Sequence, residues 1–189
     1  MAPTLETARL RLLPLVAADL PDLIRLDSDP EVMRYVGSPP GVKTPEETEA
    51  RARTRIREAE EALHEPLGFW RVEGRADRVF HGVGALIRMP TGEDVELAYR
   101  LVRSAWGQGI ATEAAAALAA HALRGLGLSR LVAVTYPDNL ASQRVLDKLG
   151  FERHGLTEYK GVRVSYHVLA HERWALRARE FDFVRPGPP

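Results

Sequence analysis

The 189-residue sequence contains no cysteine. A chain without thiols forms no disulfide, no thiolate zinc site, no iron–sulfur cluster and no cysteine nucleophile, so these chemistries are excluded. Cysteine usage therefore gives no argument for an oxidising compartment.

An excess of charge of either sign is also missing, because 26 Lys and Arg residues balance 26 Asp and Glu residues. The whole chain has no electrostatic bias toward nucleic acid or anionic lipid. Its most apolar run, residues 114–123, is mostly alanine and is interrupted by His121, far short of the ~20 residues that cross a bilayer. The first 15 residues lack the apolar stretch of a secretory signal. We expect a cytoplasmic protein with no nucleic-acid or membrane partner.

What is present is typical of a folded domain. Hydrophobic residues make up 45% and charged residues 28% of the chain, close to globular averages. The length corresponds to about one domain. We expect a single domain over residues 1–180 and a flexible tail over residues 181–189, which ends in the breaker sequence Arg-Pro-Gly-Pro-Pro.

Hydrophobic periodicity and turn residues predict an alternation of strands and helices. The expected strands are residues 8–15, 68–73, 79–89, 95–102, 131–136, 151–160 and 164–170, and the expected helices are residues 19–27, 44–64, 109–126 and 140–149. The three strands between residues 68 and 102 are separated by turn-rich segments, which is typical of an antiparallel meander.

The helix over residues 44–64 is expected to be a charged surface helix. Thr44 is the predicted N-cap, and Glu47 completes a capping box three residues later. Four arginines at alternate positions resemble a nucleic-acid arm, but Glu47 and Glu49 stand four residues before Arg51 and Arg53. This spacing favours ion pairs along a solvated helix.

The segment over residues 95–114 runs from a strand through a glycine turn into a helix. Gly107 and Gly109 permit close approach of the main chain to a ligand, and the first helical turn leaves unpaired N–H groups at the positive end of the helix dipole. A phosphate or pyrophosphate fits such a junction, and the alternative is a tight turn that only begins a helix. Thr112 replaces the third glycine of a dinucleotide fingerprint, and no Lys-Ser/Thr pair completes a P-loop.

The sequence of this turn, Trp-Gly-Gln-Gly-Ile-Ala-Thr-Glu-Ala over residues 106–114, resembles the acyl-coenzyme-A loop of the GNAT N-acetyltransferases. The branch that it resembles contains the ribosomal-protein-alanine N-acetyltransferases. Residues 139–151, Asn-Leu-Ala-Ser-Gln-Arg-Val-Leu-Asp-Lys-Leu-Gly-Phe, are similar to the second signature of that branch. Residues 5–15, 29–35 and 166–174 resemble its start, first loop and end, so the resemblance extends to about residue 175.

The resemblance implies a fold and a cosubstrate. The fold is a single α/β (α+β) domain whose mixed, mostly antiparallel sheet has six or seven strands, with helices on both faces. A splayed cleft is expected between residues 95–102 and 131–136. Acetyl-CoA is implied as cosubstrate, with its pyrophosphate on the N–H groups of residues 108–112 and its pantetheine arm along residues 101–103. The implied coenzyme residues are Leu101, Val102, Arg103, Gly107, Gln108, Gly109, Ile110, Ala111, Thr112, Asn139, Ser142, Arg144 and Lys148.

Two positions in the turn depart from the family pattern. Trp106 stands where many relatives have Gln or Arg, so a side-chain contact to phosphate is lost there. Gln108 occupies a position that is often basic, which leaves less positive charge for the pyrophosphate.

Acetyl transfer to an amine requires a group that accepts the amine proton. Glu96 matches the strand glutamate that serves as base in several family members. The alternative is an ordinary strand carboxylate paired with Arg88 or Arg100.

The leaving thiolate requires a proton or a hydrogen-bond donor. Many members use a helix tyrosine, but the matching residue here is Leu146. By resemblance the role passes to Ser142, which we expect to donate a hydrogen bond to the sulfur. The alternative is that Ser142 only satisfies a helix N-terminus, where Asn139 is itself a good N-cap.

No metal is expected. His167 and His171 are four residues apart, but their surroundings predict a strand, in which this spacing separates them by ~13 Å.

The predicted activity is acetyl transfer from acetyl-CoA to a primary amine, in first place a protein or peptide N-terminal α-amine. Two alternatives stay open: an acetyltransferase for a small amine such as a polyamine, an amino acid or an antibiotic, and a non-catalytic acyl-CoA-binding sensor. The loop over residues 38–43 is expected to decide the acceptor. A homodimer through a sheet edge or the C-terminal strands is compatible with the sequence.

Overall fold

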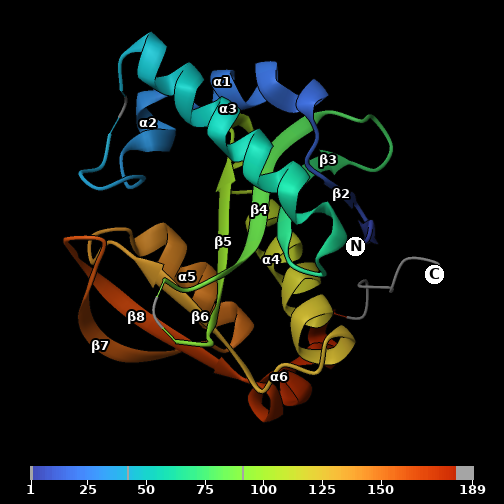
Figure 1. Ribbon diagram of the computed structural model, residues 1–189. Coiled ribbons are helices and arrows are strands. Elements are labelled where there is room, and N and C mark those ends of the chain that lie inside the picture. Colours follow the sequence, from blue (N-terminus) through green and yellow to red (C-terminus); the bar gives the residue numbers. More distant parts are fainter. Residues whose placement is uncertain (1, 42, 91, 182–189) are drawn as a thin grey trace.

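An eight-stranded mixed sheet organises the computed structural model, which describes residues 2–41, 43–90 and 92–181. The strands are β1 (Leu5–Glu6), β2 (Leu10–Pro14), β3 (Gly68–Gly74), β4 (Phe80–Arg88), β5 (Val95–Leu101), β6 (Arg130–Thr135), β7 (Glu152–Tyr159) and β8 (Val162–Ala170). Their spatial order is β1-β2-β3-β4-β5-β6-β8-β7. Figure 1 shows β4 and β5 side by side in the middle of the sheet. The sheet has one strand more than the expected upper limit of seven, because residues 5–6 form the short β1 beside β2.

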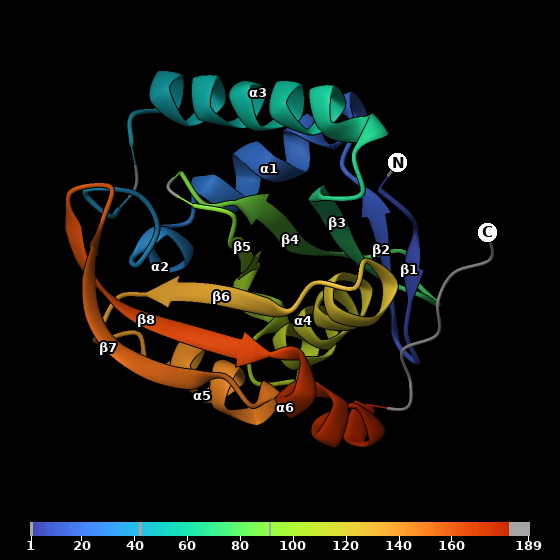
Figure 2. The ribbon, with the colours of Figure 1, turned by 60° about the horizontal axis from the view of Figure 1, so that its bottom comes forward.

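Helices cover both faces of the sheet, as predicted. They are α1 (Leu20–Asp27), α2 (Pro30–Met33), α3 (Pro45–Glu61), α4 (Ile110–Ala120), α5 (Leu140–Leu149) and α6 (His171–Arg177). Short turns of 3-10 helix occupy Ala17–Asp19, Ala62–His64, Arg103–Ala105 and Ala178–Phe181, and a π-helical turn, His121–Gly125, follows α4. Figure 2 shows α1 and α3 on one side of the sheet and α4 and α5 on the other.

Two apolar layers hold these helices on the sheet. On the α1 and α3 side, Leu23 and Ile56 belong to a cluster that includes Phe69 and Val83 of the sheet. On the other side, α4 buries an almost continuous run of alanines, which allows the helix to lie close to the strands. A Cβ atom on Gly84 of β4 would lie 2.8 Å from Leu118 Cδ1, so a larger residue at this position would displace the Leu118 side chain.

The helix α3 begins with the predicted capping box, in which Thr44 and Glu47 are reciprocal partners. The predicted pair of Arg53 with Glu49 is present at 2.6 Å. The predicted pair of Glu47 with Arg51 is wrong: Glu47 bonds to the cap, and Arg51 instead approaches Asp27 of α1 at 3.6 Å. One edge of α3 is therefore directed into the molecule rather than into solvent.

The C-terminal region contains a helix, α6, that the sequence reading did not predict. His167 lies on β8 as expected, whereas His171 begins α6. Trp174 of α6 is buried and stacks on Phe181 with ring centroids 5.5 Å apart. Phe181 thus belongs to the domain rather than to the predicted tail, and residues 182–189 lie outside the described residues. No described helix has the length and apolar character needed to cross a bilayer.

The strands β5 and β6 are the sole parallel neighbours among the described strands, and one register pair, Glu96 with Val132, joins them. From that pair onward β6 follows β8, with which it is paired along its whole length. Beyond Glu96, the edges of β5 and β6 that face each other therefore have no strand partner. This confirms the predicted splay between residues 95–102 and 131–136.

Candidate active site

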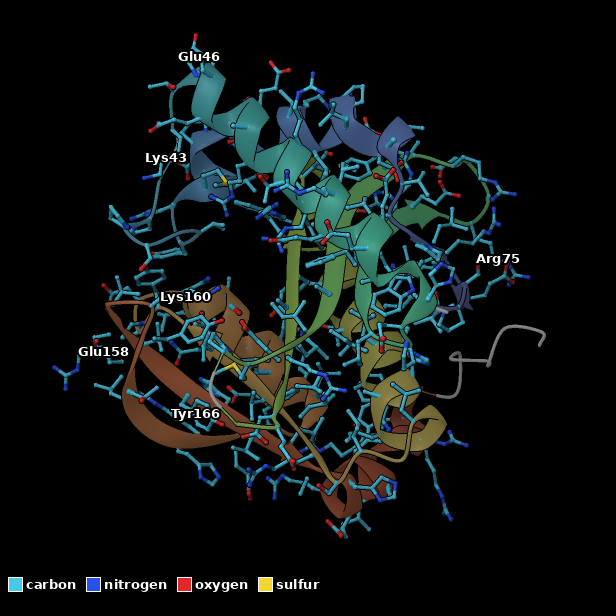
Figure 3. The ribbon with its side chains drawn as sticks, viewed as in Figure 1. Lys43, Glu46, Arg75, Glu158, Lys160 and Tyr166 are labelled. Atoms are coloured by element: carbon cyan, nitrogen blue, oxygen red, sulfur yellow. The ribbon has the colours of Figure 1, made fainter. Side chains whose placement is uncertain are left out.

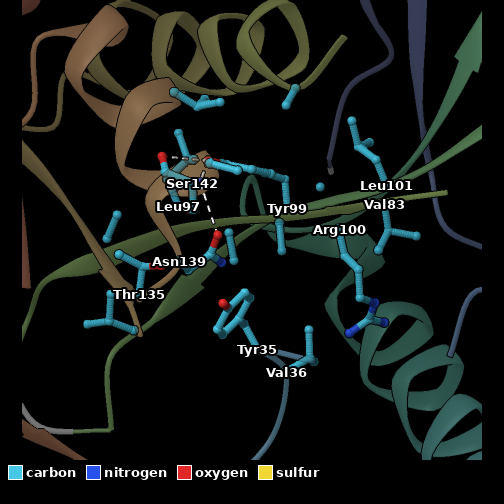
Figure 4. Close-up of a pocket in the computed structure, with 18 of the residues that line it drawn as sticks. Tyr35, Val36, Val83, Leu97, Tyr99, Arg100, Leu101, Thr135, Asn139 and Ser142 are labelled. Atoms are coloured by element: carbon cyan, nitrogen blue, oxygen red, sulfur yellow. Dashed lines mark hydrogen bonds between the residues drawn. The ribbon is translucent and has the colours of Figure 1, made fainter. Parts of the chain in front are cut away.

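A cleft of about 700 Å³ opens where β5 and β6 diverge. Its walls come from β5 and β6, the first turns of α4 and α5, the inner edge of α3, the loop after α2 and the turn between β7 and β8. Figure 4 shows this cleft with side chains converging on it from several elements.

Side chains of β5 reach the cleft on both sides of the sheet, because successive residues of a strand point to opposite faces. Tyr99 bonds to Ser142 of α5, whereas Arg100 pairs with Asp27 of α1. Figure 4 shows these two neighbours pointing in opposite directions. Glu96 shares the face of Arg100. One strand thus supplies polar groups to both walls.

The glycine turn before α4 has the conformation of an anion-binding junction. Gly107 and Gly109 have φ angles of 73° and 77°, a left-handed region that favours glycine, and Gly109 is the N-cap of α4. The α4 helix leaves its first N–H groups without intrahelical partners beside the cleft. Open space surrounds the position of a Cβ atom on Gly107, so a ligand can approach the main chain there.

Arg9 holds this turn from the other end of the chain. Its guanidinium donates to the Gln108 carbonyl at 2.9 Å and pairs with the buried carboxylate of Glu113 at 2.6 Å. The sequence reading missed Arg9, because the local pattern does not indicate contact between residues 104 positions apart.

Most of the predicted coenzyme residues line the cleft: Leu101, Gly107, Gly109, Ile110, Ala111, Thr112, Asn139, Ser142, Arg144 and Lys148. Val102, Arg103 and Gln108 are not among its lining residues.

The reasons for these three exceptions are local. The N–H of Val102 donates to the carbonyl of His81 in β4, Arg103 begins a 3-10 turn, and the Gln108 side chain donates to the Ser104 carbonyl. Since Val102 faces β4, backbone alternation turns the N–H and C=O groups of Tyr99 and Leu101 toward the cleft.

Glu96 is 7% exposed and lines the cleft. Its Oε2 accepts a hydrogen bond of 2.8 Å from the Tyr159 hydroxyl. Burial raises the pKa of Glu96, and the Tyr159 hydrogen bond and the positive charges of Lys160 and Arg55 offset part of that rise. The alternative in the sequence analysis pairs Glu96 with Arg88 or Arg100; Arg100 instead contacts Asp27 at 2.8 Å.

Tyr159 reaches the cleft because the turn between β7 and β8 is tight. Lys160 and Gly161 have φ angles of 49° and 77°, the positive values of a two-residue hairpin turn. Burial and the negative charge of Glu96 raise the pKa of Tyr159, which keeps the phenol protonated and able to donate. The sequence predicted the turn but not this contact.

Ser142 takes part in the N-terminal cap of α5 through its backbone and not through its hydroxyl. Asn139 is the N-cap of α5, and its Oδ1 accepts from the backbone N–H of Ser142 at 3.1 Å. The Ser142 hydroxyl is not used in the cap and instead lies 3.1 Å from the Tyr99 hydroxyl. Burial raises the pKa of Tyr99 to about 12, so Tyr99 stays protonated. Leu146 is buried.

The loop after α2 is held against the cleft by two hydrogen bonds. The Tyr136 hydroxyl donates to the Gly37 carbonyl at 2.7 Å, and the Ser38 hydroxyl donates to the Lys160 carbonyl at 2.6 Å. Figure 3 shows Lys160 at the hairpin turn, on the side of this loop. Residue 42 of the acceptor loop predicted over residues 38–43 lies outside the described residues.

Across residues 2–41, 43–90 and 92–181, no group of three or more histidine or acidic side chains is arranged to hold a metal ion.

Comparison with known proteins assigns the family. Residues 9–152 match the family described as Acetyltransferase (GNAT) domain. The chain is 31% identical over 158 residues to the uncharacterized N-acetyltransferase YoaA of Bacillus subtilis, covering 82% of this chain and 86% of that protein. It is 32% identical over 156 residues to the FsC-acetyl coenzyme A-N(2)-transacetylase of Aspergillus fumigatus, covering 78% of this chain and 64% of that protein.

The fold agrees with that assignment. Mycobacterium smegmatis RimJ, solved in complex with CoA-disulfide, superimposes with a TM-score of 0.76 at 21% identity, covering 97% of this chain and 95% of RimJ. The family match, the relatives and the shared fold lead to one conclusion: the chain belongs to the GNAT family and is an acetyl-CoA-dependent N-acetyltransferase.

Proposed function

We propose that the chain transfers the acetyl group of acetyl-CoA directly to a protein or peptide N-terminal α-amine, with Glu96 as base and Ser142 as donor to the sulfur. One observation carries the assignment of roles. Glu96 and Ser142 line the same cleft as the glycine turn, and they reach it from opposite faces of the sheet. The resemblance of residues 106–114 and 139–151 to the ribosomal-protein-alanine branch supports a protein acceptor.

The coenzyme fits the α4 and α5 side of the cleft. The pyrophosphate would accept hydrogen bonds from the first N–H groups of α4, beside the positive end of its dipole. Arg144 and Lys148 are exposed on α5 at the cleft and supply positive charge. The backbone groups of Tyr99 and the N–H of Leu101 would pair with the pantetheine amides as an added strand does, since the Leu101 carbonyl already accepts from Trp106 Nε1 at 3.0 Å.

The Glu96 carboxylate would accept a proton from the acceptor amine. An α-amine with a pKa of 7.7–8.0 is only about one-tenth free base at pH 7, so a base is needed for most of the acceptor. The raised pKa of Glu96 brings its proton affinity closer to that of the amine.

The chemical step forms one bond and breaks another. The amine nitrogen attacks the thioester carbonyl carbon, the N–C bond forms, the C–S bond breaks, and Glu96 takes the proton that leaves the nitrogen. Negative charge that develops on the sulfur is stabilised by the Ser142 hydroxyl. The Tyr99 hydroxyl lies 3.1 Å from Ser142 Oγ, where either oxygen can donate, and 3.3 Å from the Ser142 carbonyl, which accepts from it. When Tyr99 donates to Oγ, the serine hydrogen is left for the sulfur, so we assign Tyr99 as a positioning residue. The thiolate then takes a proton from water to give free coenzyme A, and Glu96 returns the proton that it took from the nitrogen to water.

Glu96→Gln tests this assignment, because it keeps shape and hydrogen bonding but removes basicity. At neutral pH kcat/KM should fall by about 10²–10⁴, and the deficit should shrink above the acceptor pKa near 8, where most amine arrives as free base. The measurement is release of coenzyme A thiol from pH 6 to 9.5 with peptides that begin with Ala, Ser or Met. The protein has no cysteine and adds no background thiol. A deficit that is constant with pH, or no deficit, contradicts the role of Glu96 as base.

A further inference from the structure

Three guanidinium groups form one wall of the cleft, on the side opposite to the coenzyme residues of α5. They belong to Arg51 and Arg55 of α3 and to Arg100 of β5, and all three side chains line the cleft. We call this set the arginine wall. It is notable because the whole chain has equal numbers of acidic and basic residues.

Among the buried carboxylates of the described residues, Asp27 is the one in ion-pair contact with the arginine wall. Asp27 is 3% exposed and is shared by Arg100 at 2.8 Å and Arg51 at 3.6 Å. Arg55 pairs with Glu58 at 3.1 Å, but the Glu58 side chain is 47% exposed and solvent screens that pair. Asp27 thus pairs with two of the three cations, while Glu96, which is also buried, acts on Arg55 without an ion-pair contact.

Burial and mutual repulsion make the charged form of Arg100 less favourable than in water. Burial and the neighbouring charges of Arg51 and Arg55 lower the pKa of Arg100 to about 10, although Asp27 opposes this, and Arg100 remains protonated at neutral pH. Its Nε is buried without a hydrogen-bond partner. The Arg51 and Arg55 side chains keep 26% and 30% of their surface exposed, so an anion in the cleft can reach them.

The arginine wall lies along the path of the acceptor. Glu96 and Arg100 are four residues apart on the same face of β5, which corresponds to about 13 Å. Arg55 is near enough to both residues for its charge to affect the pKa of each. An amine at Glu96 would place the following atoms of the acceptor toward the guanidinium groups.

We propose that the acceptor carries a carboxylate near its primary amine and that the arginine wall binds this carboxylate. The inference rests on the N-acetyltransferase function proposed above and narrows its substrate class. Guanidinium groups bind carboxylates through charge-assisted, often bidentate hydrogen bonds. An acidic residue next to a peptide N-terminus and a free amino dicarboxylic acid share this chemistry. Polyamines, which carry only positive charge, are disfavoured.

The test compares acceptors that differ in one group. Three peptide amides, Ala-Glu-Ala, Ala-Gln-Ala and Ala-Lys-Ala, separate charge from shape because glutamine matches glutamate in size. We expect kcat/KM for the glutamate peptide to exceed that for the glutamine peptide by about ten- to a hundredfold, and the lysine peptide to be the poorest. Free glutamate and glutamine form the second arm and distinguish a small acceptor from a peptide.

Variants assign the preference to the arginine wall. Arg51→Gln and Arg55→Gln, alone and together, should reduce the ratio of glutamate to glutamine peptide toward 1. Arg53→Gln is the matched control, since Arg53 is on the same helix, is 63% exposed, pairs with Glu49 and does not line the cleft. Arg100 is left unchanged because its removal would strand the buried Asp27 charge.

Each outcome decides the inference separately from the proposed function. Equal kcat/KM for the glutamate and glutamine peptides in the unaltered protein overturns the inference while leaving the acetyltransferase intact. A preference that survives in the Arg51 and Arg55 double variant also overturns it. Preference for free glutamate over every peptide supports carboxylate binding and overturns the protein acceptor. Acetylation of none of these amines overturns both proposals.

Discussion

The hydrogen bond from Tyr159 to Glu96 makes a quantitative prediction for the variant Tyr159→Phe. The bond stabilises the ionised carboxylate and thereby holds down a pKa that burial raises. Removing it should raise the pKa of Glu96 further, so that the base is protonated over a wider range of pH. The acidic limb of kcat/KM should therefore move to higher pH.

The size of the shift follows from the strength of the bond. A hydrogen bond to a charged group contributes about 1.5–3 kcal/mol, and 1.36 kcal/mol corresponds to one pKa unit. Tyr159 is only half-buried, so water replaces part of the lost bond, and we expect a shift of about one unit. Well above this pKa the rates of the variant and the unaltered protein should converge, because Tyr159 positions the carboxylate and takes no part in the bonds that change.

The assay is kcat/KM from pH 5 to 9 with one peptide acceptor. Tyr166→Phe is the control: the Tyr166 hydroxyl also donates to a carboxylate, Asp94, at 3.3 Å, but Tyr166 does not line the cleft. Equilibrium unfolding gives an independent readout. The bond supports the charged form of Glu96, so the stability lost in Tyr159→Phe should be greatest above the folded pKa of Glu96 and should diminish as pH falls through it. An acidic limb that stays in place, or one that moves equally in Tyr166→Phe, refutes this reasoning.

Two further variants test the coenzyme side of the cleft. Acetyl-CoA at 100 times its Kd should stabilise the protein by about 2.7 kcal/mol and so raise its melting temperature, and Gly109→Val should abolish this rise. The control Gly127→Val, at a glycine with a similar φ of 68° and no neighbour within 4 Å, should keep the rise. A rise that persists in folded Gly109→Val contradicts the assignment of the turn. Ser142→Ala should lower kcat by roughly ten- to a thousandfold without changing the acetyl-CoA Kd or the stability, since the α5 cap uses the backbone N–H. Tyr99→Phe should lower kcat by a smaller factor than Ser142→Ala. If the single-turnover rate of Ser142→Ala equals that of the unaltered protein, Ser142 has no chemical role.

Local signals in the sequence were sufficient for most of the fold. The capping box at Thr44, the N-cap Asn139 and the C-cap glycine at residue 150 each satisfy a helix end with nearby atoms, so a short window contains the whole interaction. The helix α6 escaped prediction because its seven residues are ordered by the packing of Trp174 on Phe181, and a polar, arginine-rich window does not indicate that contact.

The site was less accessible to sequence reasoning, because it depends on contacts between distant segments. Glu96 and Ser142 were identified by resemblance, and the structure places both at the cleft. Their partners Tyr159 and Tyr99 lie 63 and 43 residues away along the chain. Arg51 fitted an ordinary helical ion pair on spacing alone, and only the packing of α3 on α1 brings it to Asp27.

The contact between Arg9 and Glu113 affects the order in which the protein is assembled during synthesis. Arg9 emerges from the ribosome early, whereas Gln108 and Glu113, to which it bonds, follow about a hundred residues later. Closing so long a loop is entropically costly and slow compared with local pairing. A nascent chain that ends after α3 therefore already carries Arg51 and Arg55 but has no completed turn for a pyrophosphate. Binding of the coenzyme by a growing chain would therefore indicate that its N-terminal strands have already packed against α4.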